Sequence, residues 1–297
     1  MAAAPSSAGV PGTVALVLPE HAPAQAGGRL RRTLKISVPA GLLAVIFFLC
    51  FLGPLIFAVP GPTFTNILDA NEPIFSAHHV LGTDQVGYDV WSRILYGGRT
   101  SLEIALAVNA IGLVVGGMFG AIAGYLGGIR DAVMMRIIDV LIAFPAIVLA
   151  IAIAERLGPS EFHVILALSV FSVPAFARLS RAATLRVREQ TFITAARLSG
   201  TRTPRILLRH VVPNIIPQLT TFTLLGMGIT VVLEGALSFL NLGIPSPQPS
   251  WGNMIASGQT VLTAEPRLVL VPSIALFITV LSLNLLGDGL REHWGSR

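Results

Sequence analysis

Long apolar runs, separated by short polar or basic segments, dominate the pattern of residues along this chain. A helix needs about 20 apolar residues to cross the hydrocarbon layer, because each residue advances it by about 1.5 Å. Six runs meet or approach that length, and we predict six transmembrane helices at 38–59, 104–126, 137–154, 162–177, 215–233 and 268–286. The fourth is short and contains Pro174, and the fifth has room to continue past Glu234 to about Leu240. The pattern therefore predicts an all-α integral membrane protein.

The positions of the basic residues predict how the helices are oriented. If the N-terminus is inside, only four of the 20 Lys and Arg residues fall on the outer side: Arg93, Arg99, Arg156 and Arg267. Cytoplasmic segments of membrane proteins carry an excess of Lys and Arg. We therefore predict that both termini and the very basic segment 178–213 are cytoplasmic, and that 60–101 and 241–267 lie outside.

These boundaries divide the chain into three parts. Residues 1–34, rich in Ala, Pro and Gly, are predicted to form a disordered cytoplasmic tail. Residues 35–96 would hold the first transmembrane helix and a long extracytoplasmic segment, in which 88–94 is amphipathic and suits a helix on the outer surface. Residues 97–297 would form a five-helix core. No charged residue occurs between 36 and 68, a run longer than the core of about 7–15 residues in a signal peptide, so a retained helix is favoured.

Composition supports the membrane interpretation and removes two alternatives. Only 12% of the residues are charged, against about 25% in soluble domains. The net charge of +5 is also found in nucleic-acid-binding proteins, but here the basic residues lie between apolar runs, so we expect no nucleic-acid partner. The single cysteine, Cys50, lies inside an apolar run, which excludes a disulfide framework.

The sequence contains no motif typical of an enzyme or a metal site. It has no G-x-x-x-x-G-K-[ST] loop and only one lysine, Lys35, so we predict that the chain binds no nucleotide or other cofactor. An intramembrane serine protease would need a base near its serine, and His163 is the only candidate, with no G-x-S-x-G motif present. His78 and His79 lie near Glu72 and Asp84, but adjacent histidines in an outer loop favour a structural role over a metal site.

Glycines recur at four-residue spacing in the second apolar run. Such spacing places them on one face of a helix, where another backbone can approach closely. We favour helix packing over a pore-lining role for this stripe of Gly112, Gly116, Gly120 and Gly124.

Four polar residues lie within the apolar runs: Asn109, Asp139, Glu234 and Asn284. Charged groups in lipid are unfavourable, so they usually face protein or water. Asp139 is one turn from Arg136, and we predict a local ion pair between them. Glu234 is predicted to lie near the outer surface, where it would either line a transport path or be an ordinary interfacial residue.

The basic segment 189–214 has a helix stop followed by a helix start. Gly200 suits the position after a helix C-terminus, and Thr203-Pro204 suits an N-cap followed by the first helical residue. This pattern predicts two short helices that meet at a bend and protrude from the membrane. The alternative is a basic loop that only contacts lipid headgroups.

Three separated motifs resemble one family. Thr194-Ala195-Ala196-x-x-x-Gly200 followed by His210-Val-Val-Pro213 is similar to the E-A-A-x-x-x-G…I-x-L-P loop of ATP-binding-cassette (ABC) importer permeases, with Thr194 in place of Glu and His210 in place of Ile. Residues 79–93 are similar to the H-x-L-G-T-D-x-x-G-x-D-x-x-S-R signature. With 234–243 and 249–253, they resemble the C-type subunit of dipeptide and oligopeptide permeases, the DppC/OppC family.

The resemblance implies a type I ABC importer permease fold in a bacterial inner membrane. It implies four partners: a B-type permease, two cytoplasmic ATPases that bind ATP and Mg, and an extracytoplasmic substrate-binding protein. Residues expected to couple to an ATPase are Thr194, Ala195, Ala196, Gly200, Thr203, Pro204, Arg205, Arg209 and Pro213. Residues expected at a binding-protein docking site or outer gate are His79, Gly82, Thr83, Asp84, Asp89 and Trp251.

The cargo expected from the resemblance is a short peptide, moved by alternating access. Related permeases for nickel, glutathione or haem form one alternative. A self-sufficient secondary transporter or channel forms another, although it would leave the basic protrusion unexplained and hydropathy shows no matched pair of broken helices.

Overall fold

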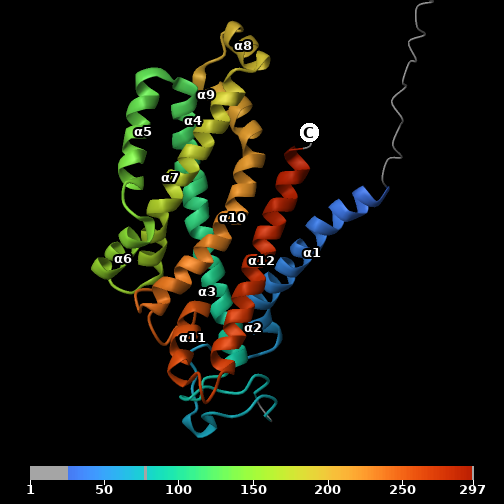
Figure 1. The fold of residues 1–297 in the computed structure, drawn as a ribbon, viewed down its shortest axis with the longest axis vertical. Coiled ribbons are helices and arrows are strands. Elements are labelled where there is room, and N and C mark those ends of the chain that lie inside the picture. The colour runs from blue at the N-terminus through green and yellow to red at the C-terminus, as the bar shows by residue number, and fades with distance from the viewer. Residues whose placement is uncertain (1–25, 77–78, 296–297) are drawn as a thin grey trace, which may run out of the picture.

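The computed structural model describes residues 26–76 and 79–295, of which 26–33 and 295 are described only by their backbone. The described residues form an elongated bundle of helices (Figure 1), with α8 (Thr191–Leu198) at one end and the loops between α2 (Gly53–Ile56) and α3 (Val90–Ile111) at the other. The described part contains isolated β-bridges in these loops but no extended strand. The predicted disordered tail lies largely outside the described residues.

Five continuous helices are long and apolar enough to span a membrane. The first is α1 (Ala26–Phe51). The second joins α3, the π-helical turn η2 (Gly112–Gly116) and α4 (Gly117–Leu126), and the third is α7 (Glu161–Arg188). The fourth joins α9 (Thr203–Ile206), the π-helical turn η3 (Leu207–Val211) and α10 (Val212–Phe239), and the fifth is α12 (Arg267–Gly295). A sixth span exists if α5 (Gly128–Ile142) and α6 (Ala146–Leu157) are counted together.

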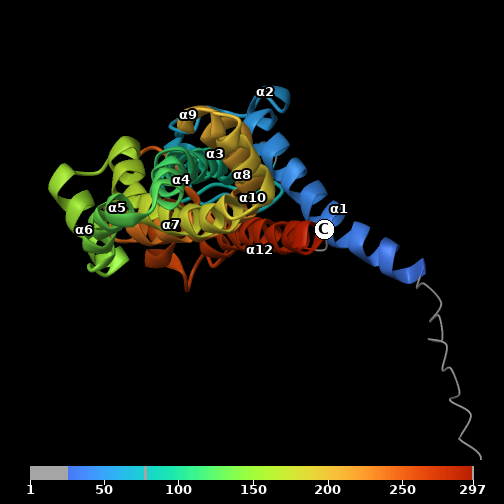
Figure 2. The ribbon, with the colours of Figure 1, turned by 90° about the horizontal axis from the view of Figure 1, so that it is seen from above.

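The α5–α6 pair corrects the prediction of one straight helix at 137–154. The two helices differ in direction by 75° across the break at 143–145. Proline lacks a backbone N–H and disfavours helical geometry in the residue before it. Pro145 therefore explains the break, and Figure 2 shows that α5 and α6 lie at one side of the bundle, with α1 at the opposite side.

Several other predicted boundaries are wrong, including the ends of the first and last helices, which lie at Phe51 and Gly295 instead of 59 and 286. The first helix already begins at Ala26, inside the predicted tail. The second begins at Val90 instead of 104, so 88–94 holds no separate surface helix but the start of α3, where the Asp89 carboxylate accepts a hydrogen bond from the Ser92 N–H at 2.7 Å. Helix α7 runs to Arg188 instead of 177, with Pro174 inside it. The extension to about Leu240 is confirmed, because α10 ends at Phe239.

The glycine stripe lies against α7, which confirms its predicted role in helix packing. A Cβ atom on Gly116 would lie 3.0 Å from the carbonyl carbon of Val173, and one on Gly124 would lie 2.9 Å from the Arg181 carbonyl oxygen. Gly112 and Gly120 likewise leave no space for a side chain next to Phe176 and Ala177. Missing side chains thus bring the backbones of α4 and α7 together.

Charged residues on α5 pair with α7. Asp131 forms two hydrogen bonds of 2.6 Å with Arg181, and Asp139 accepts one of 2.8 Å from Arg178. The predicted pair between Asp139 and Arg136 is therefore wrong. Because Arg178 is 39 residues from Asp139, only the packing of the two helices brings the pair together.

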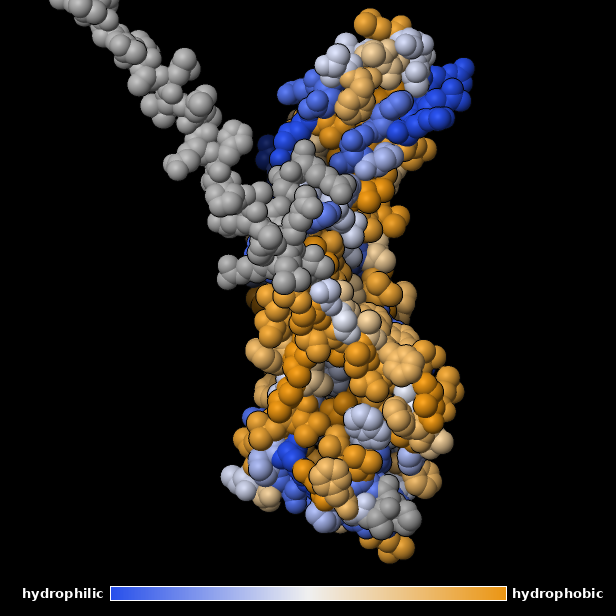
Figure 3. Space-filling view, turned by 90° about the vertical axis from the view of Figure 1, so that its right-hand side faces the viewer, coloured by the Kyte–Doolittle hydropathy of each residue, from blue (hydrophilic) through white to orange (hydrophobic). Residues whose placement is uncertain are grey.

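The surface has the polarity expected of a membrane protein. Figure 3 shows a broad hydrophobic band, with a strongly hydrophilic region near the α8 end and a mixed region at the opposite end. Exposed large side chains in the helices include Val114, Val140, Ile229 and Phe277. Such a continuous apolar surface suits contact with lipid or with another transmembrane subunit.

Candidate functional site

The bend predicted at Gly200 is present, and its backbone geometry explains it. Gly200 has a φ of 71°, in the left-handed region that favours glycine. Its N–H donates to the Arg197 carbonyl at 3.0 Å, and the Thr201 N–H donates to the Ala196 carbonyl at 3.1 Å. These two bonds satisfy carbonyls at the C-terminus of α8 in the Schellman arrangement. We call residues 191–213 the elbow.

The second arm of the elbow differs from the prediction. Thr203 is the first helical residue and not the N-cap, a position held by Arg202 without a side-chain hydrogen bond. The second helix is also not short, because it continues from Thr203 to Phe239 as one span of 37 residues. The bend therefore joins α8 directly to a helix that reaches the opposite side of the bundle.

The elbow exposes most of the residues predicted to couple to an ATPase. Those exposed are Thr194, Ala195, Gly200, Thr203, Pro204, Arg205, Arg209 and Pro213, whereas Ala196 is half-buried. Sequence reasoning missed three exposed apolar side chains here, Leu198, Phe192 and Leu208, of which Leu198 is 85% exposed. Their signal in the sequence is a large apolar residue in a segment that lies outside every predicted span.

Buried residues fix the elbow to the rest of the bundle. Ile193 and Ile206 are completely or almost completely buried in a cluster with Tyr125 at the end of α4. The Arg197 Nε donates to the Tyr125 hydroxyl at 3.2 Å, and the same buried cluster includes Ala183 of α7. The elbow is thus a defined surface that is held in place by α4 and α7.

The residues predicted for the outer face form a tightly bonded loop. The His79 Nδ1 lies 2.9 Å from an Asp89 carboxylate oxygen, and the buried Thr83 hydroxyl accepts the Glu72 N–H at 2.9 Å and donates to the Asp69 carbonyl. The Asp84 carboxylate accepts the Val86 and Tyr88 N–H groups at 3.0 and 2.9 Å. Among the residues described, which omit His78, no group of three potential ligands could hold a metal ion.

Arg267 connects this loop to the last helix. Its guanidinium donates to the carbonyls of Leu81 at 2.8 Å, Glu72 at 2.7 Å and Thr83 at 3.0 Å. A Cβ atom on Gly82 would lie 3.0 Å from the guanidinium carbon. The motif residues therefore set the shape of the outer loop as well as any surface that it presents.

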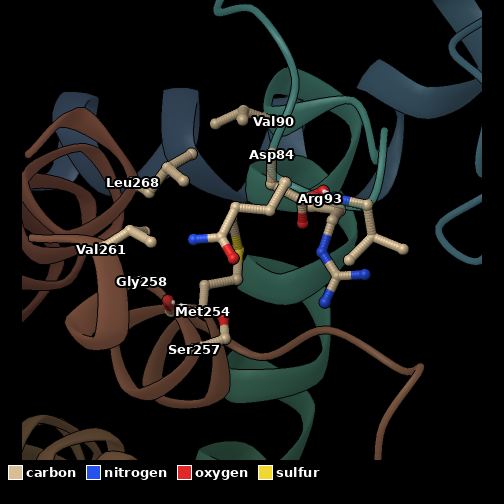
Figure 4. A pocket seen from close by; sticks show the side chains of 10 residues that line it. Asp84, Val90, Arg93, Met254, Ser257, Gly258, Val261 and Leu268 are labelled. Atoms are coloured by element: carbon tan, nitrogen blue, oxygen red, sulfur yellow. Dashed lines mark hydrogen bonds between the residues drawn. The ribbon is translucent and has the colours of Figure 1, made fainter. Parts of the chain in front are cut away.

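A small cavity lies between the outer loop and α11 (Trp251–Gly258), as Figure 4 shows. Its volume is about 90 Å³. Asp84 and Arg93 line it from the outer loop and α3, and Met254, Ser257 and Leu268 line it from α11 and α12. The cavity is large enough for one or a few water molecules or a small side chain, but not for a peptide.

Trp251 and Glu234 are buried, as are Gly82, Thr83 and Asp89 in the outer loop. The Trp251 side chain is only 1% exposed, and its Nε1 donates to the Ile94 carbonyl at 3.1 Å. Glu234 is completely buried and accepts hydrogen bonds from Ser101 and Ser238. Because the chain itself covers both side chains, Trp251 offers no docking surface and Glu234 lines no path in this structure, and the outer-gate role of Trp251 stays a prediction.

Comparison with known proteins shows what kind of protein this is. A family model described as "Binding-protein-dependent transport system inner membrane component" matches residues 116–297, which include the elbow, α10 and α11. The chain belongs to this family. It is thus an inner-membrane permease component of an ABC importer, with several transmembrane helices, and the alternative of a self-sufficient secondary transporter or channel is excluded.

Curated relatives cover most of the permease. The glutathione transport system permease protein GsiD of Pectobacterium atrosepticum is 38% identical over 265 residues, which are 88% of each chain. The dipeptide transport system permease protein DppC of Alkalihalophilus pseudofirmus is 39% identical over 217 residues, 73% of this chain and 71% of its own. GsiD of Escherichia coli O157:H7 is 42% identical over 217 residues, 73% of this chain and 72% of its own.

Proposed function

We propose that this permease imports a short peptide, either a dipeptide or oligopeptide or the tripeptide glutathione. The observation that carries this proposal is that the similar permeases named above serve glutathione or dipeptides, with alignments over 73–88% of the chain. No feature of the described residues favours nickel or haem over a peptide. A zwitterionic peptide needs a protein path, because a bare charge at the bilayer centre costs at least about 2.5–3.5 kcal/mol on insertion scales.

The partners follow from the same proposal. The permease pairs with a related B-type permease, and an extracytoplasmic binding protein delivers the peptide to the outer face around residues 79–93. Two cytoplasmic ATPases bind ATP and Mg and hydrolyse the nucleotide, so this chain binds no cofactor. It acts by alternating access and is not an enzyme.

The elbow is the contact with one ATPase in this proposal. Its tip combines the exposed apolar side chains of Leu198 and Phe192 with exposed arginines at 202, 205 and 209. Protein interfaces commonly combine apolar anchors with arginine, whereas a surface that only contacts headgroups needs no ordered bend. Closure of the ATPases would move the elbow and, through the helix from Thr203 to Phe239, the outer side of the permease.

Deletion of the gene for this chain in a peptide auxotroph tests the cargo. We expect the strain to lose growth on di- to tetrapeptides, or on glutathione as sole sulfur source, and to regain it with the wild-type gene. Uptake of free amino acids serves as the control. If peptide and glutathione uptake are normal in a strain with no second peptide system, the proposed cargo is wrong, and loss of nickel or haem uptake would identify the alternative.

A further inference from the structure

The outer loop 241–258 reaches into the bundle next to three helices. Its helix α11 packs against α10, α12 and α3, and Trp251 belongs to a buried cluster with Cys50 on α1 and Leu102 on α3. Two glycines make room for it. A Cβ atom on Gly98 would lie 2.5 Å from the Trp251 ring, and one on Gly252 would lie 2.9 Å from the Gly235 carbonyl oxygen.

One carboxylate lies at the centre of the polar contacts that hold this loop. Glu234 on α10 accepts a hydrogen bond from the Ser101 hydroxyl of α3 at 2.9 Å and from the Ser238 hydroxyl at 2.7 Å. The Ser250 hydroxyl, at the N-cap of α11, lies 3.4 Å from the Ser238 hydroxyl and so extends this group of contacts to the loop. All four side chains are at least 97% buried, so none of them has water as an alternative partner.

Each of these hydroxyls also accepts a backbone N–H of the loop. Ser101 accepts from Trp251 at 3.3 Å, Ser238 from Ile244 at 3.4 Å, and Ser250 from Asn253 at 3.1 Å. A serine hydroxyl has one hydrogen to donate, whereas a carboxylate only accepts. Because Glu234 accepts the hydrogens of Ser101 and Ser238, the lone pairs of these two hydroxyls remain directed to the loop N–H groups.

We propose that Glu234 is a positioning residue that holds the outer loop 241–258 to α3 and α10, so that the outer ends of these elements move as one body during transport. Glu234 lies on the same helix as the elbow, 31 residues after Thr203, or about 45 Å along the helix axis. A displacement of the elbow therefore reaches the loop through one helix and one carboxylate.

The native cysteine offers a probe for this role. Cys50 is the chain's sole cysteine, it is buried, and it lies next to the Trp251 indole. While the loop is seated, Cys50 is protected. The test measures the rate at which N-ethylmaleimide labels Cys50 in membranes that hold the complete transporter, by the mass shift of this chain alone.

Glu234→Gln keeps the side chain's size but replaces one of the two accepting oxygens with a donating NH2 group, so either Ser101 or Ser238 loses its acceptor. We expect labelling of Cys50 to become at least about tenfold faster, a change of about 1.4 kcal/mol in the opening equilibrium. Ser101→Ala removes only the hydroxyl that joins Glu234 to the Trp251 N–H, so it should accelerate labelling less. The double variant should label little faster than Glu234→Gln alone. Asp139→Asn is the matched control, because it removes a carboxylate paired on α5 and should leave Cys50 protected.

A second measurement separates positioning from simple loss of stability. We expect Glu234→Gln to lower the amount of cargo transported per ATP hydrolysed in the reconstituted complex. A chain that is only destabilised would lower the transport rate and the hydrolysis rate together, in proportion to its abundance, and leave their ratio unchanged. This readout rests on the proposed function, but the labelling of Cys50 does not and stays informative with any cargo. If Glu234→Gln fails to insert, Ser101→Ala carries the test. The proposal would be overturned if inserted Glu234→Gln or Ser101→Ala chains had the wild-type rate of Cys50 labelling and the wild-type amount of cargo transported per ATP.

Discussion

Arg197 in the elbow and Tyr125 at the end of α4 are joined by two interactions. The Arg197 Nε donates to the Tyr125 hydroxyl at 3.2 Å, and the guanidinium carbon lies 4.9 Å from the centre of the tyrosine ring. The ring is buried, whereas Arg197 is exposed, so the contact fixes a surface element to the bundle. The contact ties α8 to the end of α4.

Substitutions at this contact should weaken binding of the ATPase in graded steps. Tyr125→Phe removes the hydroxyl but keeps the ring, and Arg197→Ala removes both interactions. The two interactions together contribute about 1 kcal/mol. We therefore expect Arg197→Ala to need about fivefold more ATPase for the same amount to co-purify, and Tyr125→Phe to need a smaller increase. Arg130→Ala, at an exposed arginine of α5 outside the elbow, is a control for charge alone. Equal binding by Arg197→Ala and wild type would show that the contact does not order the elbow.

The close packing at the glycine stripe predicts that adding a single methyl group there destabilises the protein. Gly120→Ala would place a Cβ atom 2.9 Å from the Ala177 Cα and even closer to its carbonyl oxygen, so α4 and α7 would have to separate. We expect a loss of about 1–3 kcal/mol in stability, seen as a lower thermal midpoint in detergent and less protein in the membrane.

The control for this prediction is Gly41→Ala in α1, where a Cβ atom meets nothing within 4 Å. It should leave stability unchanged or raise it slightly, because alanine favours helices more than glycine does. A Gly120→Ala protein as stable as Gly41→Ala would contradict the close packing of α4 against α7.

The predicted orientation can be tested with two equally exposed leucines. Leu68 in the outer loop is 89% exposed and Leu198 in the elbow is 85% exposed. In a Cys50→Ser background, Leu68→Cys should react with an impermeant thiol reagent in intact cells. Leu198→Cys should react only after permeabilisation, in a strain without the ATPase. Reaction of both from outside would refute the assignment of α8 to the cytoplasm.

Features of the fold that depend only on residues close together in the sequence can be predicted from it. Gly200 as a helix stop and the glycine stripe as a packing face follow from local geometry and helical periodicity, and the structure contains both. The break at Pro145 was also visible in the sequence, but the hydropathy of 137–154 concealed it. The early start of α3 depends on Asp89 as its N-cap, whereas hydropathy alone places the start of the apolar run at 104.

Contacts between distant residues were not predictable from the same patterns. The sequence predicts that Glu234 lies near the outer surface, either lining a path or as an interfacial residue, but the side chain is buried and Ser101, 133 residues earlier, supplies a partner. Asp139 was paired with the nearest arginine in the sequence, whereas α7 supplies Arg178. Hydropathy locates a helix but does not indicate which helices lie beside it.

The bend at Gly200 gives the sharpest test of coupling. A Cβ atom at Gly200 meets nothing within 4 Å, so a substitution there acts through the backbone and not through a clash. A left-handed conformation costs an ordinary residue about 1–2 kcal/mol, and β-branched residues are disfavoured further, whereas asparagine tolerates it. Gly200→Val should therefore reach the membrane in normal amounts but redirect α8 and lose ATPase association and transport. Gly200→Asn should retain most of both.

The double variant Arg205→Ala with Arg209→Ala distinguishes two roles of the elbow. One is coupling to the ATPase, and the other is electrostatic anchoring to the membrane surface. Each arginine near an anionic membrane surface contributes about 1 kcal/mol of attraction. If the segment is only a basic anchor, the double arginine variant should reduce insertion and Gly200→Val should have little effect. If it couples, Gly200→Val should abolish stimulation of ATP hydrolysis by the loaded binding protein while its abundance stays normal. The decisive measurement is that stimulation in the reconstituted complex, and full transport by a normally inserted Gly200→Val permease would refute the coupling role.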